Sequence, residues 1–119
     1  MSITKLTPTL WTNDLKGTVE FYTSFLGFSC KGLELDYGWA SLEKDQVSIM
    51  LSLPPDNSQF SKPLFTGSLY LFTDDANEEW MMLKDSVEVS YPIEDFDYGM
   101  REFGILDNNG YLIQFGQEI

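Results

Sequence analysis

The chain has 119 residues, of which 43% are hydrophobic and 15% aromatic, enough for one globular domain with a true core. Nineteen Asp and Glu against seven Lys and Arg give a net charge of −12, which disfavours nucleic acid and anionic membrane surfaces and favours cationic ligands. Histidine is absent, which excludes Ser-His-Asp and Cys-His catalysis and any His-ligated metal site. The acidity can also serve solubility alone.

Cysteine use and hydropathy indicate the compartment. Cys30 is the single cysteine, so no internal disulfide is possible, and without a histidine to activate it a nucleophilic role is not expected. No run approaches the roughly 18 apolar residues of a membrane span, and the first residues lack the apolar core of a signal peptide. We expect a cytoplasmic protein.

The first half of the chain predicts a strand, a helix and three further strands. Asn13 or Asp14 is placed to cap the helix and Gly27 to end it. A polar, Pro-bounded loop carrying Phe60 follows. The predicted ranges are a strand at 3–11, a helix at 15–26, strands at 28–34, 37–43 and 46–53, and a loop at 54–64.

The second half repeats this order, and an offset of 61 residues superimposes the two halves. Asp74 or Asp75 is the predicted cap of the second helix. We therefore predict an α+β fold of two βαβββ modules, 1–53 and 65–119, forming one domain of curved mixed sheets around a ligand-binding cleft. The ranges are a strand at 69–73, a helix at 76–84 and strands at 86–92, 100–106 and 111–116.

The last two strands form a predicted hairpin. Asp107-Asn108-Asn109-Gly110 separates them, and Asn-Gly can take the positive φ values of a tight turn. Alternation puts Leu112, Gln114 and Gly116 on one face. Gln114 is either a polar residue on a solvated face or part of a pocket wall.

Charged residues also stand before and within these strands. The run Glu94-Asp95-Phe96-Asp97 reads as a solvated loop or as the rim of the cleft. Arg101 and Glu102 point to opposite faces, so Arg101 is expected to pair with another carboxylate. Glu102 is the inward-facing strand acid available for acid–base chemistry.

Three segments resemble the glyoxalase, bleomycin-resistance and extradiol-dioxygenase superfamily, also called the vicinal oxygen chelate fold. They are the opening strand and helix at residues 8–28, the segment 67–74, and residues 98–115, which are similar to the family pattern WGMREF…DPDGN…F. The resemblance implies four inward metal-ligand positions, which fall here on Thr7, Met50, Ser68 and Gln114. None is a His or a carboxylate, so we expect no metal and no cofactor. Gln114 becomes a pocket-lining candidate.

The resemblance to the metal-free, antibiotic-sequestering members implies a homodimer that holds a planar cationic ligand between aromatic rings. Tyr98 stands where the family pattern has Trp, and Tyr37 is the suggested opposing ring. Each of these aromatics can instead be ordinary packing. The expected ligand-binding residues are Asp36, Tyr37, Trp39, Met50, Phe60, Tyr98, Glu102 and Gln114, with no catalytic residue assigned.

Two alternatives remain open. One is a lyase, isomerase or dioxygenase whose metal has moved to carboxylates such as Asp36, Asp95 or Glu102. The other is a scaffold domain without a ligand, its cavity filled by Met50, Trp11 and other large side chains.

Overall fold

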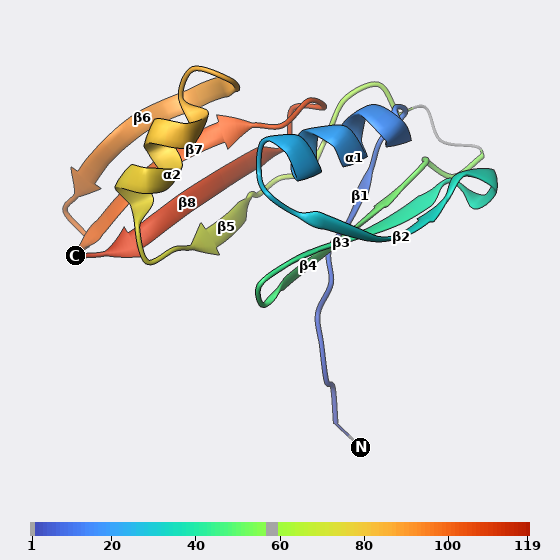
Figure 1. Cartoon of the computed structure of the whole chain (residues 1–119), viewed down its shortest axis with the longest axis horizontal. Helices are drawn as coiled ribbons and strands as arrows, with labels where there is room; N and C mark the ends of the chain where they lie inside the picture. Colours follow the sequence, from blue (N-terminus) through green and yellow to red (C-terminus); the bar gives the residue numbers. More distant parts are fainter. Residues whose placement is uncertain (1, 57–59) are drawn as a thin grey trace. The chain divides into compact units, whose positions relative to one another are not determined.

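The computed structural model describes residues 2–56 and 60–119, and the chain divides into two compact units, Met1–Ser61 and Lys62–Ile119. Each unit contains one helix and one four-stranded mixed sheet, as Figure 1 shows. The predicted α+β class with two repeated modules is confirmed. Of the predicted loop 54–64, residues 57–59 lie outside the described residues.

The first unit has the sheet order β1-β4-β3-β2, with β1 parallel to β4 and the other pairs antiparallel. The predicted strand 3–11 is too long, because β1 begins only at Thr9 and Ile3 and Leu6 are exposed. The elements are β1 (Thr9–Trp11), α1 (Leu15–Ser24), β2 (Ser29–Glu34), the 3-10 turn η1 (Leu35–Tyr37), β3 (Trp39–Lys44) and β4 (Val47–Ser52).

The second unit has the equivalent order β5-β8-β7-β6. The predicted strand 86–92 ends too early: β6 continues to Phe96, so the acidic run at 94–97, read as a solvated loop or as the rim of the cleft, lies mostly in a strand. Pro92 is tolerated there because β6 is the edge strand and its register shifts between Tyr91 and Glu94. The elements are β5 (Leu69–Phe72), α2 (Ala76–Leu83), β6 (Glu88–Phe96), β7 (Met100–Leu106) and β8 (Leu112–Glu118).

Hydrogen bonds repeat between the two units: the helix caps lie at the predicted offset of 61 residues, and the strand-exit bonds have donors offset by 61 and acceptors offset by 64. Asp14 accepts from the Gly17 amide at 3.0 Å, and Asp75 accepts from the Glu78 amide at 3.0 Å, so both helices have an aspartate N-cap. The Thr12 amide donates to Ser52 and the Thr73 amide to Gly116, at 2.9 and 2.8 Å. The internal repeat therefore extends to individual capping and strand-exit contacts.

In each unit the helix covers one face of the sheet, and the core lies between them (Figure 1). In the first unit, β3 and β4 bury alternate residues against α1, among them Leu42, Ile49 and Leu51. In the second unit Phe103 stacks on Phe115 with ring centroids 5.0 Å apart and also contacts Trp80. The opposite face of each sheet is left free of its helix.

The predicted hairpin joins β7 to β8, but the turn is not organised by Asn-Gly alone. Asp107 Oδ1 accepts hydrogen bonds from the amides of Asn109, Gly110 and Tyr111 at 2.8 to 2.9 Å. Only Gly110 of this turn takes a positive φ, at 102°. The aspartate side chain thus fixes the register in which β8 pairs with β7.

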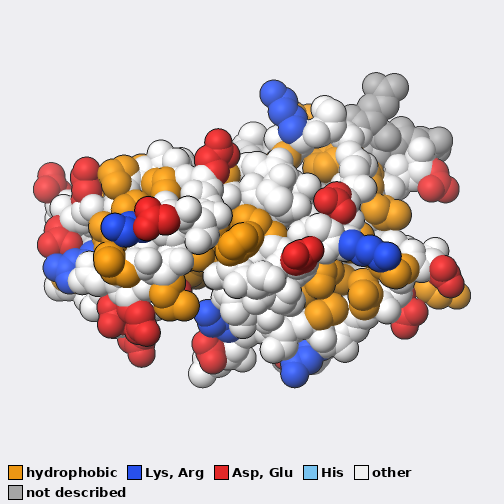
Figure 2. All heavy atoms as spheres, turned by 45° about the horizontal axis from the view of Figure 1, so that its top comes forward, with side chains coloured by type: hydrophobic (Ala, Val, Ile, Leu, Met, Phe, Trp, Pro, Cys, Tyr) orange, Lys and Arg blue, Asp and Glu red, His pale blue; other side chains and the backbone are white. Residues whose placement is uncertain are grey.

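Acidic side chains are scattered over the face of the molecule seen in Figure 2 and do not gather into a single patch. Among the described residues, no helix is long and apolar enough to cross a bilayer.

Candidate functional site

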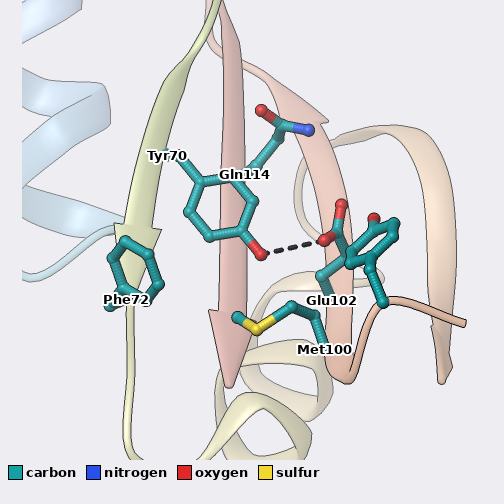
Figure 3. A pocket seen from close by; sticks show the side chains of 6 residues that line it. Tyr70, Phe72, Met100, Glu102 and Gln114 are labelled. Carbon is teal, nitrogen blue, oxygen red and sulfur yellow. Dashed lines mark hydrogen bonds between the residues drawn. The ribbon is translucent and has the colours of Figure 1, made fainter. Parts of the chain in front are cut away.

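The sheet face of the second unit that α2 leaves open carries a polar group surrounded by aromatic rings. Strand alternation places Phe103 in the core and therefore Glu102 on the opposite face. The same argument places Gln114 there, between Ile113 and Phe115. Figure 3 shows Tyr70 from β5 directing its hydroxyl at Glu102, with Gln114, Met100 and Phe72 around them.

Glu102 is a buried carboxylate held by tyrosines. Its side chain is only 3% exposed. Tyr70 donates to Oε1 at 2.8 Å, and Tyr91 donates to Oε2 at 2.5 Å. All the partners that Glu102 has in the described part of the chain are phenol hydroxyls, so no cation neutralises its charge.

These hydrogen bonds decide the protonation state of the group. Burial by itself would raise the pKa of Glu102, but the surrounding tyrosine hydroxyls, that of Tyr91 foremost, bring the pKa below its ordinary value of 4.5. Burial, together with the neighbouring carboxylate, raises the pKa of both Tyr70 and Tyr91. The site therefore holds an ionised glutamate and protonated tyrosines at neutral pH.

Gln114 extends this network towards the start of β5. Its Nε2 donates to the Tyr91 hydroxyl at 2.8 Å, and its Oε1 accepts from the Ser68 hydroxyl. Both ends of the amide are thus engaged, which fixes its orientation. Gln114 is part of a polar pocket floor and not a solvated strand residue.

Two glycines allow the tyrosine rings to lie flat on the sheet. A Cβ at Gly104 would lie 2.3 Å from the Tyr91 ring, and a Cβ at Gly116 would lie 1.9 Å from the Tyr70 hydroxyl. Contacts this short are impossible, so a side chain at either position would displace a ring. The glycines and tyrosines form a matched set.

Two open hollows lie over this floor. One, of about 400 Å³, is lined by Tyr70, Phe72 and Met100; the other, of about 360 Å³, is lined by Tyr91, Pro92, Glu94 and Phe96. Both are also lined by Tyr98, Glu102 and Gln114. The predicted residues Tyr98, Glu102 and Gln114 are therefore brought together in one place.

Tyr98 lies in the turn between β6 and β7 and is 63% exposed. Its ring stacks on Phe96, with centroids 5.5 Å apart and an interplanar angle of 5°. One face of the ring is therefore covered by Phe96.

The expected carboxylate partner of Arg101 is Asp95. Arg101 Nε and Nη2 donate to the two Asp95 oxygens at 2.7 and 3.1 Å, a bidentate pair that links β6 to β7. The hydrogen bond from Arg101 lowers the pKa of Asp95.

The other expected ligand-binding residues lie in the first unit. Trp39 and Met50 share the face of their sheet that α1 leaves open, since they alternate with buried residues of β3 and β4. Asp36 and Tyr37 are exposed in η1, and the ring of Phe60 contacts Trp11 with centroids 6.2 Å apart.

Five residues of the site were not predicted: Tyr70, Phe72, Tyr91, Pro92 and Met100. Aromatic residues in strands usually indicate packing, so nothing in their own strands sets them apart. The available signal was Gly104 and Gly116 inside strands, because an interior glycine marks close approach of another group.

Known protein families and solved structures resemble this chain. A family model described as the Glyoxalase/Bleomycin resistance protein/Dioxygenase superfamily matches residues 4–115. The chain belongs to this superfamily. A comparison with curated proteins gives no significant match.

Several solved structures share the superfamily fold over almost the full chain. A superfamily member from Sphaerobacter thermophilus DSM 20745 is 24% identical, with 98% of each chain covered and a TM-score of 0.80. TnmS3, an antibiotic binding protein from Streptomyces sp. CB03234, is 19% identical, covering 100% of this chain and 99% of its own, with a TM-score of 0.78. Lactoylglutathione lyase from Agrobacterium tumefaciens is 17% identical, covering 96% and 92%, with a TM-score of 0.73. Identities this low indicate a common fold only.

The residues at the superfamily's metal-ligand positions do not suit a metal. Ser68 donates to Gln114 Oε1, the one oxygen of that amide which could bind a cation, while Thr7 and Met50 offer a hydroxyl and a thioether. Of the proposed relocated carboxylates, Asp95 is held by Arg101. Within residues 2–56 and 60–119, no three His, Cys, Asp or Glu side chains gather as a metal site requires.

Gly104→Ala should destabilise the protein by about 1–3 kcal/mol, because the new methyl group must push the Tyr91 ring off the sheet. Urea unfolding measures this cost. In a Tyr91→Ala background the same change should cost less than about 1 kcal/mol, since no ring is left to collide. An equal cost in both backgrounds would contradict the proposed packing.

Glu102→Gln should change how stability depends on pH. Because the folded-state pKa of Glu102 lies below 4.5, its ionisation stabilises the fold above the unfolded-state pKa, and this stabilisation is lost as the pH falls through the folded-state pKa. The difference in unfolding free energy between wild type and Glu102→Gln should be constant above about pH 5 and change in favour of the variant towards pH 3. Urea unfolding across this range, with Glu88→Gln as an exposed control on β6, provides the measurement; a pH-independent difference would refute the assignment.

Proposed function

We propose that the protein is a metal-free small-molecule-binding protein, whose ligand is amphipathic or aromatic with a positively charged group held near Glu102. The observation that carries this proposal is a buried, ionised carboxylate without a cationic partner among the described residues. A buried charge is costly unless it is hydrogen-bonded and paired, and here only the hydrogen bonds are supplied by the protein. A cationic ligand would supply the missing opposite charge.

The walls of the hollows suit the rest of such a ligand. Phe72, Met100 and the rings of Tyr70 and Tyr98 present apolar and aromatic surface beside the carboxylate. Glu94 adds a second negative charge in the neighbouring hollow. Aromatic faces and carboxylates both attract a flat cation.

The proposed function also includes the fate of the ligand and a role for residues of the first unit. By analogy with TnmS3, an antibiotic binding protein of the same fold, the ligand is sequestered and not converted. Asp36, Tyr37, Trp39, Met50 and Phe60 remain proposed ligand-binding residues of the first unit. The open hollows argue against the alternative of a scaffold domain whose cavity is filled.

We further propose a homodimer in the cytoplasm. Dimerisation is suggested by the antibiotic-sequestering members that the sequence resembles, and the cytoplasm by the lone Cys30. Sedimentation velocity at micromolar concentration should give about 27 kDa, twice the 13.6 kDa of the chain. A 13.6 kDa species would remove dimerisation from the proposal.

Binding is tested with proflavine, a planar aromatic cation that carries N–H donors. Wild-type protein should bind it saturably, as measured by fluorescence titration, and Glu102→Gln should weaken binding about tenfold or more through loss of a charge-assisted hydrogen bond.

Glu88→Gln is the matched control, since it removes the same charge from an exposed position on β6. It should change the affinity less than twofold, as expected for a screened surface charge. Absence of saturable binding, or equal effects of the two substitutions, would refute a cation site at Glu102.

A further inference from the structure

A second carboxylate lies opposite Glu102 on the open face of the sheet. Glu94 of β6 and Glu102 of β7 are direct partners in the antiparallel ladder, so their side chains lie on the same side of the sheet. Both also line the hollow beside Tyr91 and Phe96. Side chains that face each other in such a pair have Cβ atoms about 4.5–5.5 Å apart, so one small ligand can reach both carboxylates.

An irregularity of β6 creates this pairing. Tyr91 is the partner of Gly104, so regular alternation would place Ile93 opposite Glu102. The register shifts between Tyr91 and Glu94, and the extra residue brings Glu94 to this position instead. Bulges of this kind re-aim side chains next to functional sites. A second acid therefore stands where the regular strand would have an apolar residue.

The chain leaves both negative charges without a cation. Arg101, the cation next to Glu102 in the sequence, lies on the other face of the sheet and pairs there with Asp95. Within residues 2–56 and 60–119, no Lys or Arg forms an ion pair with either glutamate. Like charges directly opposite each other on a sheet destabilise the strand pair. The arrangement is thus unfavourable for the free fold and suits a ligand that brings positive charge to both positions.

We propose that the ligand is an aromatic dication, whose first positive group binds Glu102 and whose second binds Glu94. This inference rests on the proposed function and adds the number of charges on the ligand and the residue that recognises the second one. Glu102 lines both hollows and lies beside the apolar wall of Phe72 and Met100, whereas Glu94 lines the hollow on the β6 side. The aromatic body then lies against Phe72, and the second cationic group reaches past Glu102 towards β6. Glu94 is a specificity-determining residue, because it separates dications from monocations.

The two carboxylates contribute unequally to binding. Glu102 is 3% exposed, whereas Glu94 is exposed and its attraction is weakened by solvent and salt. The second contact forms within a ligand that Glu102 already holds, so it requires no further loss of translational freedom. The net charge of −12 favours any dication, wherever it binds. A test must therefore compare variants as well as ligands.

The test is a competition titration against bound proflavine with two ligands that share one ring. Meta-xylylenediamine carries two ammonium groups, and meta-methylbenzylamine carries one. Wild-type protein should bind the diammonium compound about fivefold to tenfold more tightly than the monoammonium compound. Glu94→Gln should reduce this ratio to about twofold, the value expected from two equivalent ends, and should change the affinity for the monoammonium compound less than about twofold.

Glu88→Gln is the matched control, since it removes the same charge from an exposed position of the same strand, and its ratio should equal that of wild type. Thermal unfolding confirms that each variant is folded. A wild-type ratio of about twofold or less, a ratio that Glu94→Gln leaves unchanged, or an equal fall in both variants would each overturn the second cation site. These results differ from failure of the proposed function, in which proflavine does not bind or Glu102→Gln binds it as wild type does; that failure would overturn this inference as well.

Discussion

The open face of the second sheet depends on one constraint, the burial of the Glu102 carboxylate. A buried carboxylate must receive hydrogen bonds, and here the donors come from β5 through Tyr70 and from β6 through Tyr91. Because β5 and β6 are the two edges of the sheet, these bonds tie both edges to the central strand β7. The rings can cross the sheet surface only where neighbouring positions lack a side chain, and this explains the glycines at 104 and 116. No buried polar side-chain atom of the described residues is left without a partner.

Such an arrangement does not maximise stability. Apolar side chains of similar volume would avoid the cost of desolvating a charge and would not require two aligned phenols. The carboxylate remains ionised and unneutralised, beside apolar aromatic walls, in a chain that already carries a net charge of −12. In the proposed function, the local charge would act together with the overall field to attract a cation, and the aromatic rings would provide contact area for the body of the ligand.

The sequence predicted features set by local patterns and missed those set by contacts across strands. The 61-residue repeat and the strand faces of Glu102 and Gln114 follow from spacing, and the structure agrees; of the two caps that the sequence offered for each helix, the structure has Asp14 and Asp75. The end of β6 was wrong because Pro92 and the acids after it are typical of loops, whereas an edge strand accommodates both. Tyr70 and Tyr91 were missed because their roles depend on a carboxylate and glycines from neighbouring strands, whose pairing no single strand reveals.

Comparison of the two units shows that the scaffold and the site chemistry have diverged to different degrees. The strand-exit hydrogen bonds make Ser52 equivalent to Gly116 and Met50 equivalent to Gln114. Strand register then makes Trp39, the partner of Ser52, equivalent to Glu102, the partner of Gly116. The same backbone positions therefore present an indole and a thioether in one unit and a carboxylate and an amide in the other. Since the capping contacts are retained in both units, the difference lies in the open faces of the two sheets and not in the contacts that begin the helices.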